Sequence, residues 1–146
     1  MLTLSLGLGL GDRLKQKQLK ITPQRLAIFN MLCNTTAHPN AETVFKSLAP
    51  QYPGLSLATV YKTLDSFCEA GLLQELNVNE GRFRYDANME AHPHFVCRSC
   101  AQVLDVQGIS GAEDMRRQVA DMLGVTVDKE QLFFYGTCKA CLAESN

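Results

Sequence analysis

Two cysteine pairs, each with two residues between its members, are the groups in the chain best suited to chemistry. They are Cys97 with Cys100 and Cys138 with Cys141, and thirty-seven residues separate the two pairs. Zinc in structural sites prefers four thiolates in a tetrahedron, and a Cys-x-x-Cys turn supplies two of them from one bend. The spacing therefore predicts a structural zinc site that joins the start of the C-terminal region to its end.

Disulfides and a redox dithiol are the alternatives for these pairs. The first ten residues lack the basic start and cleavage site of a secretory signal, so an oxidising compartment is not expected. A redox-active Cys-x-x-Cys is expected in a thioredoxin-like βαβ unit, and the sequence around these pairs does not predict one. Structural zinc, by contrast, supplies about 10–16 kcal/mol of folding free energy to a small domain. Cys33 and Cys68 lie in apolar helical stripes and are expected to be core thiols.

Histidine and aspartate form a second group of potential ligands. His92 and His94 are two residues apart in a segment that looks extended, so their imidazoles are expected on one face. Asp105 on the next strand can approach that face, Asp86 ends a hairpin, and His38 precedes a proline. Such nitrogen and carboxylate ligands suit iron, manganese or zinc. Taken singly, each residue also fits an ordinary structural role: His38 that of a loop residue, Asp86 that of a turn residue and Asp105 that of a surface strand residue.

Three helices and a hairpin are predicted over residues 22–85. The expected helix N-caps are Thr22, Asn40 and Ser56. Two alternating segments, residues 73–78 and 82–85, are joined by residues 79–81, which is a hairpin pattern. Helix, helix, helix, hairpin is the order of a winged helix-turn-helix, whose third helix enters the major groove of DNA.

The character of the chain changes after residue 88. Strands are predicted over residues 94–96, 103–106 and 131–135, with a helix over 114–123. The fold class is α+β, with an N-terminal winged helix-turn-helix followed by a small α/β domain. The expected divisions are a flexible extension over 1–11, a winged helix over 12–88 and a zinc-stapled domain over 89–146.

The charge is distributed unevenly along a chain whose formal net charge is -1. Residues 1–89 hold nine Lys/Arg against seven Asp/Glu, whereas residues 90–146 hold five against eight. Five of the basic residues lie between Arg13 and Arg25. This distribution is compatible with a DNA-binding module followed by another domain, although a solvated helix face would give the same pattern.

The sequence resembles the ferric-uptake-regulator (Fur) family and, within it, the peroxide-responsive (PerR) branch. The resemblance covers nearly the whole chain from about Asp12. The matching stretches are Ile21-Thr22-Pro23-Gln24-Arg25, Ala58-Thr59-Val60-Tyr61-Lys62-Thr63-Leu64, the run from His92 through Cys100, and Tyr135-Gly136-Thr137-Cys138-Lys139-Ala140-Cys141.

The resemblance implies a cytoplasmic, homodimeric repressor with no membrane segment that binds double-stranded DNA at a palindromic operator. The C-terminal domain is then a dimerisation domain, and the four cysteines hold one structural Zn2+ per chain. One regulatory Fe2+ or Mn2+ per chain is expected between the domains, with the ligands His38, Asp86, His92, His94 and Asp105. In the peroxide-responsive branch, iron-dependent oxidation of a ligand histidine, here His38 or His92, releases the DNA.

The resemblance also assigns the DNA contacts. Tyr61 is expected against thymine methyl groups, and Lys62 against phosphate or a guanine edge. Lys15 and Arg25 are expected to contact the DNA backbone. The burial pattern of the third helix leaves Ala58, Thr59, Lys62 and Thr63 facing outward. The full set of expected contacts is Lys15, Arg25, Ser56, Ala58, Thr59, Tyr61 and Lys62.

Other functions remain open from the sequence. An iron-responsive regulator is one, although Asp105 stands where iron-sensing relatives commonly carry Glu, and Ala91-His92-Pro93-His94 replaces their His-His-Asp-His run. Glu130 occupies roughly the place of a further family histidine, so a third metal site is not expected. Less favoured are a metalloenzyme that uses the His/Asp site, since no nucleophile–base pair accompanies it, and a zinc-stapled interaction module.

Overall fold

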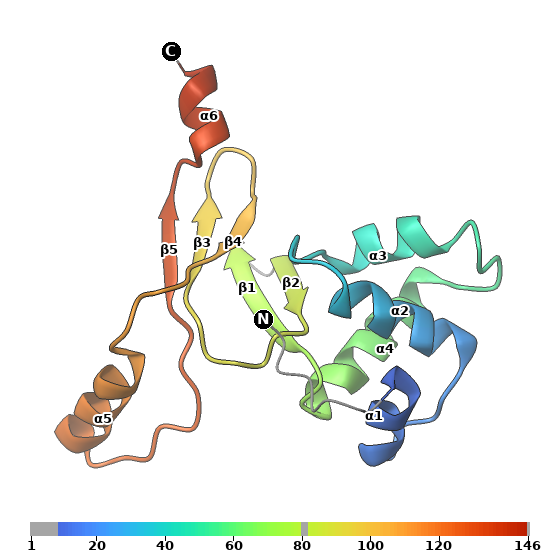
Figure 1. Ribbon diagram of the computed structural model, residues 1–146, viewed down its shortest axis with the longest axis horizontal. Helices are drawn as coiled ribbons and strands as arrows, with labels where there is room; N and C mark the ends of the chain where they lie inside the picture. The colour runs from blue at the N-terminus through green and yellow to red at the C-terminus, as the bar shows by residue number, and fades with distance from the viewer. Residues whose placement is uncertain (1–8, 80–81, 146) are drawn as a thin grey trace. The chain divides into compact units, whose positions relative to one another are not determined.

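The computed structural model describes residues 9–79 and 82–145 (Figure 1). The chain divides into two compact units, with the boundary between Met89 and Glu90. Residues 1–8 of the expected extension, and Glu80 and Gly81 of the expected hairpin turn, lie outside the described residues. Within the described ranges, no helix is both long and apolar enough to cross a membrane.

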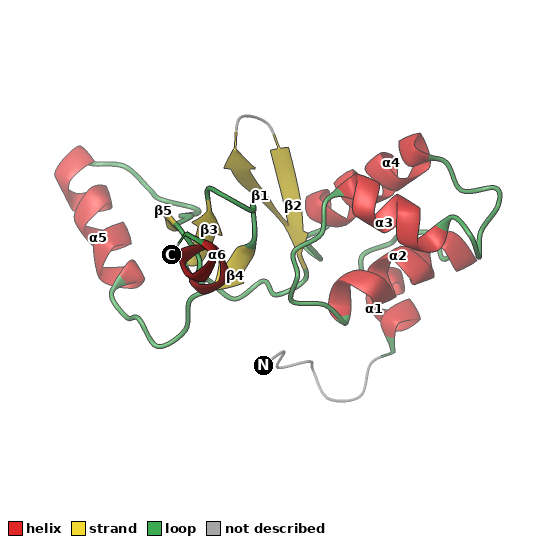
Figure 2. Cartoon of the chain, turned by 90° about the horizontal axis from the view of Figure 1, so that it is seen from above, coloured by secondary structure: helices red, strands yellow, loops and turns green. Residues whose placement is uncertain are grey.

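Among its described residues, the N-terminal unit contains four helices followed by a two-stranded antiparallel sheet (Figures 1 and 2). The elements are α1 (Leu10–Gln16), α2 (Pro23–Cys33), α3 (Ala41–Leu48), α4 (Leu57–Glu69), β1 (Gln74–Asn79) and β2 (Arg82–Asp86). From α2 onward this is the predicted order of three helices and a hairpin. The pairing starts with Gln74 opposite Asp86 and shifts register between Asn77 and Asn79.

Side-chain N-caps begin α2, α3 and α4 where the sequence predicted them. A cap oxygen accepts a hydrogen bond from a backbone N–H that has no partner within the helix. The bonds run from the N–H of Arg25 to Thr22 (3.1 Å), of Thr43 to Asn40 (2.8 Å) and of Thr59 to Ser56 (3.1 Å). These caps fix where each helix starts, and hence which residues of α4 face solvent.

Helices α2 and α4 meet through a pair of phenylalanines in the core of this unit. The ring centroids of Phe29 and Phe67 are 5.4 Å apart, and neither side chain is exposed to solvent. Val60, Leu64 and Phe67 form the buried stripe of α4, as the sequence predicted. Cys33 and Cys68, expected as core thiols, are half-buried and pack against this core.

Helix α1 was not predicted, and it includes residues 10 and 11, which the sequence assigned to the extension. Its Leu14 is fully buried in the core, and the guanidinium of Arg13 lies over the ring of Phe29, 4.8 Å from the centroid. The helix has only seven residues, and its N-cap Gly9 supplies no side-chain hydrogen bond. A helix under two turns without a side-chain cap leaves little signal in the sequence, and tertiary packing stabilises it instead.

The C-terminal unit contains a three-stranded sheet with strand order β4-β3-β5. The elements are β3 (His94–Cys97), β4 (Val103–Asp105), α5 (Ala112–Leu123), β5 (Phe133–Gly136) and α6 (Lys139–Glu144). Strand β4 is antiparallel to β3, and β5 is parallel to it, which requires a crossover connection. Helix α5 lies on that crossover (Figure 1). The predicted strands and helix of this region are all present, with ends shifted by one or two residues.

Helix α5 presents an apolar face to solvent. All of its residues are described, and none of them is buried. Met122 is 81% exposed and Leu123 is 69% exposed, while Met115 and Val119 are each nearly half exposed. Both views show the helix set apart from the three-stranded sheet (Figures 1 and 2). A single copy of the unit therefore leaves the hydrophobic face of α5 without a covering element.

We expect the substitution Leu14→Ala to destabilise the N-terminal unit by about 2–5 kcal/mol, because it leaves a cavity in the core. Urea unfolding followed by circular dichroism should show a lower midpoint. Gln16→Ala is the control, since Gln16 is an exposed residue of the same helix. Equal midpoints for Leu14→Ala and the unsubstituted protein would show that α1 does not stabilise this unit.

Candidate metal centres

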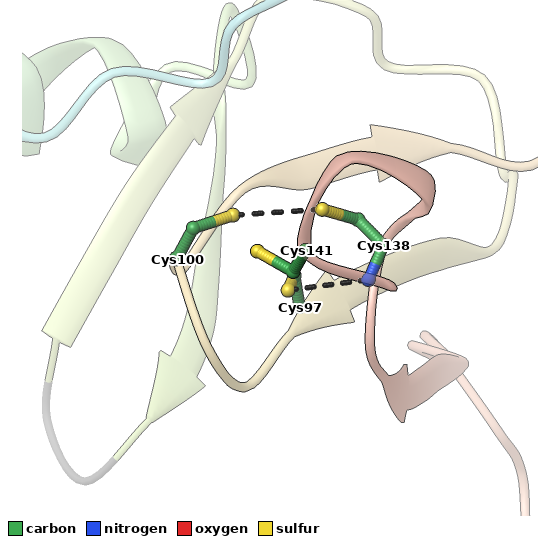
Figure 3. Close-up of side chains that lie close together, drawn as sticks. All are labelled: Cys97, Cys100, Cys138 and Cys141. Carbon is green, nitrogen blue, oxygen red and sulfur yellow. Dashed lines mark hydrogen bonds between the residues drawn. The ribbon is translucent and has the colours of Figure 1, made fainter. Parts of the chain in front are cut away.

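The four cysteine sulfurs lie together in the C-terminal unit (Figure 3). All four Sγ atoms are within 4.8 Å of one another, and those of Cys100 and Cys138 are 3.7 Å apart. Four sulfurs placed tetrahedrally 2.3 Å from zinc are separated by about 3.8 Å. The donor set and its spacing therefore fit zinc.

Two short turns bring the sulfurs to this place. Cys97 ends β3, and a tight turn follows in which the N–H of Ala101 donates to the carbonyl of Cys97 at 2.9 Å. Ala101 adopts a φ of 62°, in the left-handed region, to close this turn. The second pair lies at the start of α6, where Cys138 is the N-cap and Cys141 lies one turn later.

Backbone hydrogen bonds favour a thiolate in this cluster before any metal binds. The N–H of Cys138 donates to Sγ of Cys97 at 3.3 Å, and this bond is the main reason that the pKa of Cys97 falls to about 6. Hydrogen bonding with the sulfur of Cys138 instead raises the pKa of Cys141. Cys97 is thus held as a thiolate that accepts hydrogen bonds from neighbouring thiols. Zinc binding then displaces the protons of those thiols.

His92, His94 and Asp105 also converge within the C-terminal unit. The Oδ1 atom of Asp105 lies 2.9 Å from Nε2 of His92 and 3.3 Å from Nε2 of His94. His94 on β3 pairs with Asp105 on the antiparallel strand β4, and His92 lies two residues before His94. The two imidazole centroids are 4.3 Å apart, so the expectation that these rings share a face is confirmed. Ligand atoms 2.0–2.2 Å from one ion lie roughly 3 Å apart, which fits this spacing.

His38 and Asp86 form a second pair, in the N-terminal unit. Nε2 of His38 is 3.2 Å from Oδ2 of Asp86, and both side chains are buried. Asp86 ends β2, whereas His38 lies in the connection between α2 and α3. A buried imidazole beside a carboxylate is a suitable half of a metal site, because the carboxylate balances the charge of a cation.

The residues of α4 and its N-cap that are expected to contact DNA are exposed, apart from Thr59. Ser56, Ala58 and Lys62 are exposed, Thr59 is half-buried and Tyr61 is 40% exposed. The prediction that Thr63 faces outward is wrong, since its side chain is 3% exposed. Positions 60, 63, 64 and 67 share one helical face, and Thr63 completes the buried stripe there.

Glu42 is a neighbour of Tyr61 that the sequence did not indicate. The Tyr61 hydroxyl donates to Oε1 of Glu42, in the first turn of α3, at 2.6 Å. This bond lowers the pKa of the Glu42 carboxyl and raises the pKa of Tyr61. Of the basic residues, Lys15 is exposed on α1, and Arg25 on α2 donates to the carbonyl of Lys20 at 3.3 Å.

The carboxylate of Glu130 forms an ion pair with an arginine. Its two carboxylate oxygens accept hydrogen bonds from Nε and Nη2 of Arg116, at 2.7 and 2.5 Å. The Arg116 hydrogen bond lowers the pKa of the Glu130 carboxyl. This bidentate pair ties α5 to the segment before β5.

A winged-helix unit followed by a unit with a thiolate cluster and a His/Asp cluster defines a class of metal-binding, DNA-associated regulators. Comparison with known proteins identifies the family. The model of the ferric uptake regulator family matches residues 16–135. The chain belongs to the ferric uptake regulator family. The expectation of a regulator rather than an enzyme is thereby confirmed.

Individual relatives agree with this assignment. The chain is 48% identical over 127 residues to a transcriptional regulator PerR of Clostridium acetobutylicum, covering 87% of this chain and 91% of that protein. It is 35% identical over 135 residues to a peroxide operon regulator of Bacillus subtilis, covering 92% of each. Among solved structures, a Campylobacter jejuni peroxide stress regulator matches with a TM-score of 0.70 and 33% identity, covering 92% of this chain and 100% of that one. An iron-containing ferric uptake regulator from Francisella tularensis matches with a TM-score of 0.73 and 27% identity, covering 85% and 95%.

Replacing Cys138 by serine is expected to abolish zinc binding and the folding of the C-terminal unit, because three sulfurs remain of a four-sulfur set. Elemental analysis by mass spectrometry should find about one zinc per chain in the unsubstituted protein and far less in Cys138→Ser. Cys33→Ser is the control and should keep its zinc. A full zinc content in Cys138→Ser would contradict the assignment of this cluster.

Proposed function

We propose that this protein is a PerR-type, metal-dependent repressor that binds double-stranded DNA and senses hydrogen peroxide. The observation that carries the proposal is the presence of two ligand sets of different chemistry in a chain that also contains a winged helix. Sulfur ligands suit a permanent structural ion, whereas imidazole and carboxylate ligands suit an exchangeable one. The two relatives whose names refer to peroxide, the peroxide operon regulator at 35% identity and the peroxide stress regulator at 33%, support the choice of signal.

The four cysteines are the ligands of one structural Zn2+ per chain in this proposal. The spacing of the four sulfurs supports this role, because it matches a closed, tetrahedral structural zinc site. Zinc bound here would connect the end of β3 to the start of α6, which follows β5, and so stabilise the pairing of β3 with β5.

One Fe2+ or Mn2+ per chain is the regulatory ion, with His38, Asp86, His92, His94 and Asp105 as its ligands. The pair His38 and Asp86 and the group around Asp105 each have ligand atoms at suitable spacing within their own unit. An ion that takes ligands from both units favours one arrangement of the winged helix over others. Operator binding then depends on whether the ion is present.

Peroxide sensing is assigned to the ligand histidines His38 and His92. Bound ferrous iron supplies the chemistry that reduces peroxide beside an imidazole. In the net reaction one oxygen atom of hydrogen peroxide is added at a ring C–H of the histidine, and the other leaves as water. The oxidised ring would be a poorer ligand, so the site would hold its ion less tightly and operator binding would weaken.

DNA recognition is assigned to α4, with Tyr61 on thymine methyl groups and Lys62 on phosphate or a guanine edge. Ser56 is the N-cap of the same helix, and Ala58 and Thr59 lie in its first turn. Lys15 and Arg25 add contacts to the DNA backbone. The carboxylate of Glu42 restrains the Tyr61 ring. A palindromic operator is expected for a homodimer.

The homodimer itself is supported by the exposed apolar face of α5. Four apolar residues of α5 are 44–81% exposed, and a second copy of the chain would cover them. Residues 89–146 therefore serve as the dimerisation domain, and residues 12–88 as the DNA-binding domain. We place the protein in the cytoplasm, where its DNA is.

Peroxide treatment should oxidise the iron form and spare the manganese form. We expect peptides that contain His38 or His92 to gain one oxygen atom only when Fe2+ is bound, because Mn2+ does not support the reaction. Intact-protein and peptide mass spectrometry measure the gain. If both forms stay unmodified and DNA release follows iron removal alone, the protein is an iron-responsive regulator instead.

Substitution of Lys62 should distinguish between its two possible DNA contacts. Lys62→Ala is expected to lose about 1–3 kcal/mol of operator affinity and selectivity if Lys62 reads guanine. If it contacts phosphate, binding weakens on all sequences and the salt dependence falls by a slope of about 1. Fluorescence anisotropy on an operator selected from random duplexes measures both quantities.

Two further variants accompany this titration. Tyr61→Ala should lose operator selectivity while the fold is kept, because Tyr61 is exposed. Lys129→Ala removes the same charge as Lys62→Ala from the other unit and should bind normally. Unchanged binding by both Tyr61→Ala and Lys62→Ala would remove α4 from the DNA interface.

A further inference from the structure

Two neighbouring residues of β2 hold the backbone of His38 and of the next residue. Nη1 of Arg84 donates to the carbonyl oxygen of His38 at 3.1 Å. The backbone N–H of Tyr85 donates to the carbonyl oxygen of Pro39, also at 3.1 Å. The same strand ends at Asp86, whose carboxylate lies 3.2 Å from the His38 ring. One strand therefore presents Asp86 and also fixes the peptide groups that carry His38.

The conformation of His38 gives these bonds a specific importance. Its φ is 51°, in the left-handed region that residues with a side chain rarely adopt. An unsupported connection between α2 and α3 would relax toward commoner backbone angles. That relaxation would turn the Cα–Cβ bond of His38 and carry its imidazole away from Asp86.

The geometry points to Arg84 as a positioning residue of the regulatory metal site. Arg84 holds the carbonyl of His38, keeps the left-handed backbone in place and so presets the imidazole for the ion. It does not ligate the ion itself, since a guanidinium is always protonated. This inference rests on the proposed function, because it takes His38 and Asp86 as ligands of that ion.

The charge of Arg84 gives the inference a sharp test. A positive side chain near a cation site repels the cation, so charge alone predicts that removing Arg84 tightens metal binding. Loss of positioning predicts the opposite, a weaker site, because residues that orient ligands contribute 10–100-fold to metal affinity. The direction of the change therefore separates the two effects.

The experiment is a calorimetric titration of the zinc-loaded, full-length protein with Mn2+, which binds without oxidising its ligands. We expect Arg84→Met to weaken Mn2+ binding by about 10–100-fold. Arg84→Lys, which keeps a donor on a flexible chain, should recover part of the affinity. Arg82→Met is the matched control: it removes the same charge from the same strand at an exposed position, and should bind as tightly as the unsubstituted protein.

A double substitution tests whether the effect passes through His38. In a His38→Ala background, Arg84→Met should produce no further loss of Mn2+ affinity, because the ligand that it positions is gone. A readout without Mn2+ is hydrogen–deuterium exchange of the peptide over residues 34–40. Exchange there should be faster in Arg84→Met and unchanged in Arg82→Met. If Arg84→Met does not fold, Arg84→Gln, which is too short to span the same distance, takes its place.

The outcomes distinguish this inference from the proposed function. If His38→Ala leaves Mn2+ binding unchanged, His38 is not a ligand and the proposed regulatory site fails. If His38→Ala weakens binding but Arg84→Met leaves it unchanged or tightens it, only the role of Arg84 is overturned. Equal losses from Arg84→Met with and without His38 would also overturn that role, since they indicate a general structural effect.

Discussion

The convergence of four sulfurs at one end of a small sheet is the constraint on which the C-terminal unit depends. This unit spans residues 90–146, yet few of its described side chains are buried: Pro93, His94, Val96, Cys97, Val103 and Cys138. So small an apolar core supplies little of the free energy needed to order the chain. The parallel pairing of β5 with β3, made across a long crossover, needs a further connection. The cysteine cluster provides it at the point where β3 ends and α6 begins.

The two ligand groups of this unit share one strand but differ in chemistry. His94 and Cys97 stand at opposite ends of β3, so the ordering of one end restrains the other. Sulfur ligands retain zinc, while the nitrogen and oxygen ligands suit ions that exchange more readily. Under the proposed function, the His/Asp group gains or loses its ion without loss of the sheet. In the N-terminal unit, Asp86 likewise stands at the end of a strand, β2.

Local rules predicted most of the fold and the candidate ligands. The caps at Thr22, Asn40 and Ser56, the Cys-x-x-Cys turns and the His-x-His spacing act over three or four residues, and the structure has them where the sequence placed them. What escaped prediction depends on tertiary contacts. Helix α1 has no side-chain cap and is stabilised by burial of Leu14. The bonds from Arg84 to the His38 carbonyl and from Tyr61 to Glu42 join residues 46 and 19 positions apart. No short sequence pattern signals such pairs.

The separation of the two cysteine pairs also sets an order of events during synthesis. Cys100 and Cys138 are 38 positions apart, so at 5–20 residues per second the second pair is made about 2–8 seconds after the first. Throughout that interval the nascent chain carries only half of the thiolate set, after the whole N-terminal unit has been translated. The winged helix is thus available to fold before the cluster can close.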